Sequence, residues 1–194
     1  MKFIGVNQTN DKNVAEYTFY HIVDSALVNN GKPFFIPNFA SRFEGRLCLM
    51  VRISRLGRSI SERYAYRYFD AIGIACRFVA RDFHDTLIRL EAPSDMATSF
   101  DGAVNISNCI ILKDIDKQTL SASLLIDGKL IHETEENDII VKSSRMIAAY
   151  SKYSTIRQGD YLLIDTNNEP FIATQDTHID GYLNGQPLLS FNIK

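Results

Sequence analysis

Short apolar runs separated by turn residues make up most of the chain. Residues 2–6 and 161–165 are predicted to form short strands. Residues 47–53 form a continuous apolar run broken only by Arg52, which is typical of a strand buried on both faces. From residue 103 onward the pattern favours strands over helices.

Two hairpins are indicated by turn dipeptides that join apolar runs. Asp-Gly and Asn-Gly pairs suit the two-residue turns of β-hairpins, because both turn positions need a positive φ. The expected hairpins are 120–126 with 129–132 around Asp127-Gly128, and 182–183 with 187–191 around Asn184-Gly185.

Three segments are predicted to be helical. The first begins at a cap formed by Ser59 or Ser61, carries Tyr64, Tyr68 and Ile72 on one face, and ends at Gly73. The others are 81–90 and 146–153, while 74–79 is rich in strand-forming residues. Several strands with few helices predict an α+β, mostly β fold, and no linker divides residues 1–194 into separate domains.

Composition limits the function classes. A hydrophobic content of 45% with a net charge of −2 fits one folded domain and excludes a disordered chain or a globally basic nucleic-acid binder. No apolar run reaches the length of a membrane span, and the N-terminal residues do not form a secretory signal. Three widely spaced cysteines, at 48, 76 and 109, indicate neither a zinc site nor disulfides, and we therefore expect a cytoplasmic protein.

The charge is unevenly distributed. Ten of the twelve arginines lie between Arg42 and Arg89, a stretch with no lysine and five acidic residues. This stretch has a net charge of +5, and the rest of the chain carries −7. Any of these guanidiniums that is buried needs an acidic or anionic partner.

Several sequence motifs, which occur in the same order along the chain, resemble those of the fumarylacetoacetate hydrolase family. Residues 73–84 are similar to G-x-x-x-D-x-(S/T)-A-R-D-x-Q, and 99–102 match the end of K-x-F-D-x. Residues 124–129 resemble the family hairpin, 158–163 resemble G-D-x-I-x-T-G-T-P, and 19–27 lie where the family has F-x-K-P-x-x-x-L. The resemblance implies a mixed β-roll core over 41–194, an N-terminal lid-like segment over 1–40, and a homodimer.

The resemblance also implies a metal site that this chain alters. The family holds Mg²⁺, Mn²⁺ or Ca²⁺ with an E-x-E pair and an Asp, and three carboxylates suit such hard cations. The Asp position falls on Arg77. The E-x-E pair falls on Arg46 and Cys48 in one register, or on Glu44 and Arg46 in the other.

Charge arithmetic argues against a metal in this altered site. Arginine has no acceptor atom and stays protonated, so Arg46 and Arg77 would repel a divalent cation. We therefore expect no metal cofactor, although the family would use Mg²⁺ or Mn²⁺.

Other catalytic positions of the family change too. The family lysines fall on His21 and Thr98, the lid histidine falls near Asn13, and the T-G-T-P loop becomes residues 164–167 with Asn167 at its end. The glutamine after A-R-D is His84. The chain keeps Arg81, Asp82, Phe100 and Asp101, and in the family the A-R-D arginine contacts the polar end of the substrate.

Two interpretations of the arginines remain open. Arg46 and Arg77 could pair with Asp82, Asp85 or Glu44 and fill a collapsed pocket. Alternatively they could converge with Arg81, and with Thr98 nearby, to bind a carboxylate or phosphate through forked hydrogen bonds. We interpret Cys48 as a core residue and not as a thiolate nucleophile.

These residues lead to a first hypothesis of function. We expect a catalytically inactive family member that binds a small anion or serves as a structural partner of a related subunit, with no nucleic-acid or membrane partner. The alternative is an active hydrolase, isomerase or decarboxylase of a keto- or enol-acid, such as an acylpyruvate, fumarylacetoacetate or 2-hydroxyhepta-2,4-diene-1,7-dioate. In that alternative the catalytic candidates are Arg81, His84 as base, and Asp101.

Overall fold

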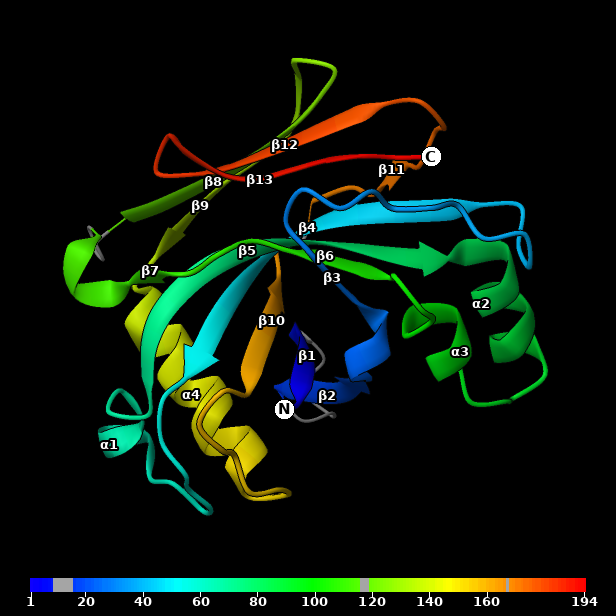
Figure 1. Ribbon diagram of the computed structural model, residues 1–194. Helices are drawn as coiled ribbons and strands as arrows, with labels where there is room; N and C mark the ends of the chain where they lie inside the picture. Colours follow the sequence, from blue (N-terminus) through cyan, green and yellow to red (C-terminus); the bar gives the residue numbers. More distant parts are fainter. Residues whose placement is uncertain (9–15, 116–118, 167) are drawn as a thin grey trace.

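The protein folds as a large curved sheet, with a smaller sheet and short helices packed around it (Figure 1). The computed structural model describes residues 1–8, 16–115, 119–166 and 168–194. Asn13 and Asn167, which the sequence comparison placed at the family's lid histidine and T-G-T-P loop, lie outside the described residues. The predicted α+β, mostly β fold class is confirmed.

The elements have the following bounds. The strands are β1 (Phe3–Gln8), β2 (Tyr17–Ile22), β3 (Leu27–Asn29), β4 (Phe43–Ile53), β5 (Phe69–Ala80), β6 (Val104–Ile106), β7 (Ile110–Ile111), β8 (Thr119–Ile126), β9 (Lys129–Asn137), β10 (Tyr161–Asp165), β11 (Phe171–Ile172), β12 (His178–Leu183) and β13 (Gln186–Asn192). The helices are α1 (Glu62–Ala65), α2 (Arg81–Arg89), α3 (Asp95–Thr98) and α4 (Ile139–Ser151), with 3₁₀ turns η1 (Asp24–Ala26) and η2 (Leu112–Asp114).

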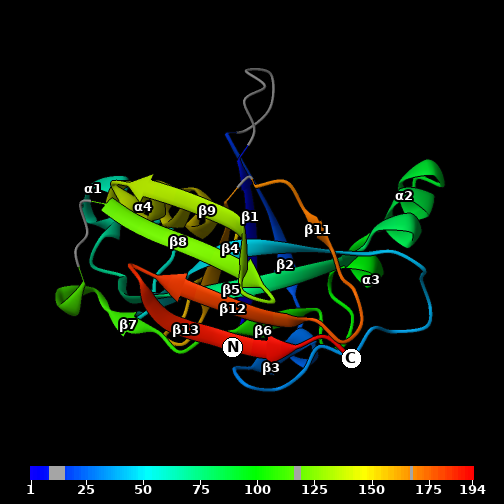
Figure 2. The same cartoon turned by 90° about the horizontal axis from the view of Figure 1, so that it is seen from above.

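The larger sheet has the order β2-β1-β10-β4-β5-β6-β3, with β11 also paired to β4 and β7 to β5. The smaller sheet has the order β13-β12-β8-β9 and forms a separate layer (Figure 2). Residues 1–40, which the resemblance assigns to a lid-like segment, supply β1, β2 and β3 to the larger sheet.

The central pair β4 and β5 is buried along most of its length. Leu47 and Ile74 on one face, and Cys48 and Ala75 on the other, are at most 1% exposed, as expected for strands covered on both faces. The predicted strand at 47–53 is confirmed, although β4 begins earlier, at Phe43. The two strands are antiparallel over their whole length, which fixes which side chains face each other.

The prediction of a helix that ends at Gly73 is wrong. Only α1 is helical there, and from Phe69 onward the chain forms β5. The spacing of four between Tyr64, Tyr68 and Ile72 is an even number, so it places residues on one face of a strand as well as of a helix. Burial on both faces then favours the strand.

Both predicted hairpins are confirmed. β8 joins β9, and β12 joins β13. Asp127, Gly128, Asn184 and Gly185 all have positive φ, as a two-residue turn between antiparallel strands requires.

Most of the other predicted elements are found, with shifted ends. β1 and β10 fall where expected, and α2 covers nearly all of 81–90. α4 begins at Ile139, earlier than the expected start at 146. None of the helices in the described residues is long and apolar enough to cross a membrane.

The helices take two positions around the larger sheet. α4 contacts α1 and β2. α2 and α3 contact each other beyond the end of β5, where Figure 1 shows them side by side. This second pair forms one wall of the site described below.

A close approach at Gly73 generates a stability prediction. A Cβ at this position would lie 2.8 Å from Ser107 Oγ and 2.9 Å from the carbonyl oxygen of Asn108. We expect Gly73→Ala to lower the free energy of unfolding by about 1–3 kcal/mol, measured by urea denaturation. Val141→Ala, at an exposed helical position, should change it by less than about 0.5 kcal/mol. Equal stability of Gly73→Ala and the parent chain would contradict the prediction.

Candidate active site

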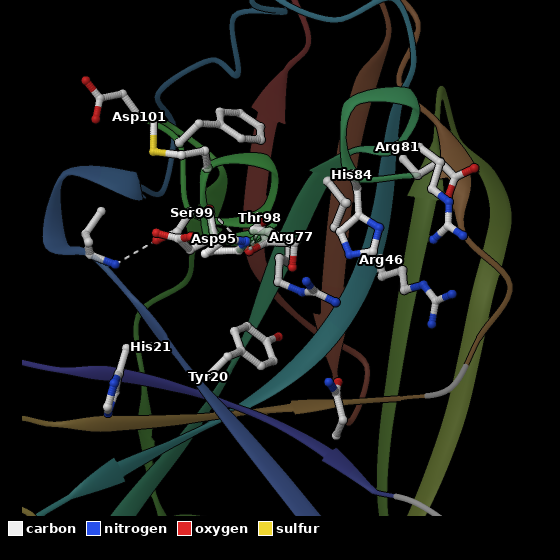
Figure 3. Close-up of a pocket in the computed structure, with 18 of the residues that line it drawn as sticks. Tyr20, His21, Arg46, Arg77, Arg81, His84, Asp95, Thr98, Ser99 and Asp101 are labelled. Atoms are coloured by element: carbon white, nitrogen blue, oxygen red, sulfur yellow. Dashed lines mark hydrogen bonds between the residues drawn. The ribbon is translucent and has the colours of Figure 1, made fainter. Parts of the chain in front are cut away.

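A pocket of about 1090 Å³ opens where β4 and β5 meet α2, α3 and residues 20–25 (Figure 3). The residues that the sequence singled out are brought together here. The pocket lining includes Glu44, Arg46, Arg77, Arg81, His84, Thr98 and Asp101. The predicted site is therefore an open cavity, and the collapsed-pocket interpretation does not describe it.

Strand alternation aims the key side chains at one place. Arg46 and Arg77 are directly opposite each other in the β4–β5 register, so both side chains lie on the same face of the sheet. Glu44 and Cys48 are two residues away from Arg46 on either side, so they share this face. Both possible registers of the family's E-x-E pair therefore lead to the same site.

Two like charges directly opposite each other are unfavourable, and Asp165 offsets them. Asp165 Oδ2 lies 3.5 Å from Arg46 Nη1 and 3.5 Å from Arg77 Nη2. Asp165 ends β10, opposite Cys48 of β4. The next residue, Thr166, donates its hydroxyl hydrogen to the carbonyl oxygen of Leu47 at 2.6 Å, which ties this end of β10 to β4.

Asp165 thus replaces the ion-pair partners expected from the sequence. Asp82, Asp85 and Glu44 were the expected partners of Arg46 and Arg77. In the structure, Glu44 pairs with Arg42, and Asp85 pairs with Arg81. The difference arises because a partner on β10 depends on sheet order, which local sequence patterns do not specify.

Two polar groups beside the arginines, Cys48 and Tyr20, are neutral, whereas Glu44 on the same face is paired with Arg42. Burial raises the pKa of Cys48 to about 12 and also raises the pKa of Tyr20 to about 12. Cys48 is therefore a buried thiol at neutral pH, as its apolar surroundings predicted. Arg46, Arg77 and Asp165 together carry a net charge of +1.

Helix α2 adds a second group of polar side chains. Arg81 Nε lies 3.1 Å from Asp85 Oδ1, and His84 Nδ1 lies 3.6 Å from the same oxygen. The ring of His84 points into the cavity that Arg46 and Arg77 also face (Figure 3). His84 is thus near the arginines and has a carboxylate beside one ring nitrogen.

The wall formed by α3 and the residues after it offers fewer polar groups for ligand binding than the sequence suggested. Thr98 lines the pocket, but its hydroxyl already bonds to carbonyl oxygens of its own helix, at Ser94 and Asp95. Asp101 is exposed at the rim and points away from the arginines (Figure 3). Ser99 Oγ accepts the backbone N–H of Val23 at 2.8 Å, which joins this wall to the chain after β2.

His21, at the position of a family lysine, is among the residues that line the pocket, but its ring points away from the arginines (Figure 3). Its neighbour Tyr20 points toward Arg77, and successive residues of a strand alternate. His21 Nε2 is hydrogen-bonded to the hydroxyl of Tyr150 on α4 at 2.7 Å. Its side chain therefore contacts the helix layer and not the arginines.

Two of the retained family residues support the walls. Asp82 Oδ2 accepts the backbone N–H and the hydroxyl of Ser41, and its Oδ1 accepts the N–H of Phe83. These bonds attach the start of α2 to the segment before β4. The buried ring of Phe100 packs edge-on against Phe43, with ring centres 5.6 Å apart.

Sequence reasoning missed two residues of the site. Asp165 could have been suspected, because it follows an apolar strand and two buried arginines demand an acid. Tyr20 gave no comparable signal, since one aromatic residue in a strand is usually core.

Relatives and solved structures show what the chain is similar to. It is 24% identical to the mitochondrial oxaloacetate tautomerase FAHD1 of Bos taurus over 171 residues, which cover 88% of this chain and 77% of that protein. It is 26% identical to the oxaloacetate tautomerase YcgM of Escherichia coli over 145 residues, covering 74% and 66%. A crystal structure of fumarylpyruvate hydrolase from Pseudomonas aeruginosa, in complex with Mn²⁺ and pyruvate, shares the fold with a TM-score of 0.89 at 15% identity, covering 100% of this chain and 89% of that one.

These relatives correct our expectation of an inactive protein. The similar proteins carry the names of enzymes, namely tautomerases and a hydrolase. The prediction that the chain is not an enzyme is therefore wrong, and the alternative of an active family member agrees better with the relatives.

The expectation of no metal cofactor is likewise contradicted, by the Mn²⁺ in the fumarylpyruvate hydrolase. The donor set of this chain still differs from the family cage. Across the described ranges, no three His, Cys, Asp or Glu side chains are grouped to hold a metal ion. The family positions carry guanidiniums, and Glu44 is engaged with Arg42. These residues do not fit a three-carboxylate cage, so we derive no reaction step through a metal.

The contacts of Asp82 predict a pH dependence of stability. Hydrogen bonds from Ser41 lower the pKa of Asp82 from its usual 3.8 to about 2. A carboxyl with a depressed pKa stabilises the fold fully above about pH 4 and loses that contribution as the pH falls toward 2. The stability deficit of Asp82→Ala, measured by urea denaturation, should therefore shrink between pH 6 and pH 2.5.

Asp82→Asn keeps an acceptor oxygen for Ser41 and separates the loss of charge from the loss of the side chain. A deficit of Asp82→Ala that is the same at both pH values would contradict the account.

The family model described as fumarylacetoacetate (FAA) hydrolase C-terminal matches residues 4–180 of the chain. The match covers the larger sheet, strands β8 and β9 of the smaller sheet and all the residues that line the pocket, and it ends within β12. Together with the shared fold, it shows that the chain belongs to the fumarylacetoacetate hydrolase family.

Proposed function

We propose that the protein is a keto–enol tautomerase of a small keto acid with two carboxylates, of the oxaloacetate type. The observation that carries the proposal is the convergence of Arg46 and Arg77 on one face of the pocket, where Asp165 balances only one of their two charges. The names of the relatives, which are oxaloacetate tautomerases, support the same reaction class.

The arginines suit the binding of the substrate. A guanidinium donates forked hydrogen bonds that match a carboxylate, and it is strongest where water is partly excluded. Arg77 is 8% exposed, and Arg81 lines the same cavity. We assign one carboxylate and the carbonyl oxygen of the substrate to Arg46 and Arg77, and the other carboxylate to Arg81.

His84 suits the proton transfer. Tautomerisation removes a proton from the carbon beside the carbonyl, turns that C–H electron pair into a C=C bond, and places a proton on the carbonyl oxygen. We assign the first step to His84 as the base, with Asp85 beside its Nδ1 at 3.6 Å, and the protonated His84 returns this proton to the enolate oxygen. Arg46 and Arg77 would stabilise the negative charge that develops on the oxygen.

Hydrolysis of a larger acylpyruvate is the second candidate. The pocket volume of about 1090 Å³ lies just above the range of about 300–1,000 Å³ that is typical of small-molecule sites. It leaves room for an acyl chain beyond a four-carbon acid. Formation of pyruvate from an acylpyruvate, followed by chromatography, separates this reaction from tautomerisation.

Assembly and location are part of the proposal. We propose a homodimer or a pair with a related subunit, as the family resemblance implies, and light scattering after size-exclusion chromatography tests this. We propose a cytoplasmic location because the three widely spaced cysteines show no disulfide pattern. Several relatives are named as mitochondrial proteins.

Substitution of Arg77 tests the role of the arginine pair. Oxaloacetate interconversion is followed by the ultraviolet absorbance of the enol. We expect the parent protein to accelerate it, and Arg77→Met to lower kcat/KM by roughly 30- to 1,000-fold, the equivalent of about 2–4 kcal/mol for a buried charged contact.

The Met variant should remain folded, because it replaces a buried charge by an apolar side chain and leaves Arg46 with Asp165. Arg89→Met, at the exposed end of α2, is the matched control and should change kcat/KM by less than about twofold. Absence of acceleration by the parent protein, or full activity of Arg77→Met, would refute the proposal.

A further inference from the structure

Tyr20 is packed against the buried guanidinium of Arg77. The Cζ atom of Arg77 lies 5.3 Å from the centre of the Tyr20 ring, within the range of a cation–π interaction (Figure 3). Both side chains line the pocket, and they come from β2 and β5, which are not neighbours in the sheet. This contact therefore joins separate parts of the site.

Arg77 needs this support because its contacts with the Asp165 carboxylate and the Cys48 thiol are long or weak. Its Nη2 is 3.5 Å from Asp165, an oxygen that Arg46 shares. Its Nε is buried and has no hydrogen-bond partner within the part of the chain that the structure describes. The negative face of an aromatic ring stabilises a cation where water is absent, so Tyr20 supplies attraction that the carboxylate does not.

Gly5 makes the position of the ring possible. Gly5 lies opposite Tyr20 in the β1–β2 register. A Cβ on Gly5 would lie 1.9 Å from the ring atom Cζ of Tyr20. The ring thus lies over the bare backbone of β1, an arrangement in which glycine in a strand permits close packing of an aromatic neighbour.

We propose that Tyr20, seated on Gly5, is a positioning residue that holds Arg77 in its orientation toward the substrate. The inference rests on the proposed function for its substrate, but the contact between Tyr20, Gly5 and Arg77 exists without it. The ring face performs this role, and the phenol hydroxyl is not needed.

A graded series of variants separates the ring from the hydroxyl. Tyr20→Phe keeps the ring face and should leave KM for oxaloacetate within about twofold of the parent value. Incorporation of 4-cyanophenylalanine at position 20 keeps the shape but weakens the negative face, and Tyr20→Leu removes the face. We expect kcat/KM to fall in this order, by roughly 3- to 30-fold for Leu, with a higher KM and a lower kcat, because Arg77 both binds the substrate and stabilises the developing charge.

Gly5→Ala approaches the same contact from the other strand. Its Cβ should displace the ring and raise KM as Tyr20→Leu does, so the test does not depend on one variant. Tyr153→Leu removes an exposed tyrosine outside the pocket and should have no effect on KM. If Tyr20→Phe instead lost as much activity as Tyr20→Leu, or if Tyr20→Leu kept the parent kcat/KM, the positioning role would be overturned.

A crystal structure of Tyr20→Leu gives a readout that does not require activity. We expect the guanidinium of Arg77 to move away from Asp165 in Tyr20→Leu and to keep its place in Tyr20→Phe. An unchanged Arg77 in Tyr20→Leu would overturn the inference, whatever the kinetics. Absence of turnover by the parent protein would refute the proposed function, and the two crystal structures would still test the role of Tyr20.

Discussion

Arg46 and Arg77 face each other across two paired strands, and one carboxylate, that of Asp165, lies between them. Like charges at opposite positions repel, and a buried guanidinium cannot lose its proton to relieve the repulsion. The site is therefore stable only if a third strand brings an acid to the same face. β10 does so, because it pairs with β4 and ends at Asp165.

The electrostatics of the pocket follow from this arrangement. Burial keeps Cys48 and Tyr20 neutral, so neither cancels the remaining positive charge. The surplus is local to Arg46, Arg77 and Asp165, because the wider lining also carries Glu44, Asp95 and Asp101. At the two arginines it favours a carboxylate over a neutral group, and the relatives are enzymes named for keto acids. The basic segment between Arg42 and Arg89 is thus partly a feature of the site and not only of the surface.

The sequence predicted the parts of the fold that local chemistry determines. The hairpins at Asp127-Gly128 and Asn184-Gly185 and the strand ending at Asp165 are of this kind, because turn geometry and apolar runs are local. The supposed helix ending at Gly73 failed because a spacing of four fits both a helix and a strand, and burial in the centre of a sheet decided between them.

The candidate site was predictable only in part, for the same reason. Motif spacing placed Arg46, Arg77, Arg81 and His84, all of which line the pocket. It did not give Asp165 or Tyr20, since their contacts depend on strand order and register. Two acidic residues that the chain shares with the family do not mark the reacting groups. Asp82 accepts hydrogen bonds from Ser41 and so attaches α2, and Asp101 points away from the arginines.

A double-mutant cycle on Arg77 and Asp165 tests the central claim most directly. The free energy of unfolding is measured by urea denaturation for the parent chain, Arg77→Met, Asp165→Asn and the double variant. If Asp165 balances the buried guanidinium, the double variant loses less stability than the two single variants together, with a coupling of at least about 1 kcal/mol. Losses that add to within about 0.3 kcal/mol would show that the two side chains act independently, and would contradict the account.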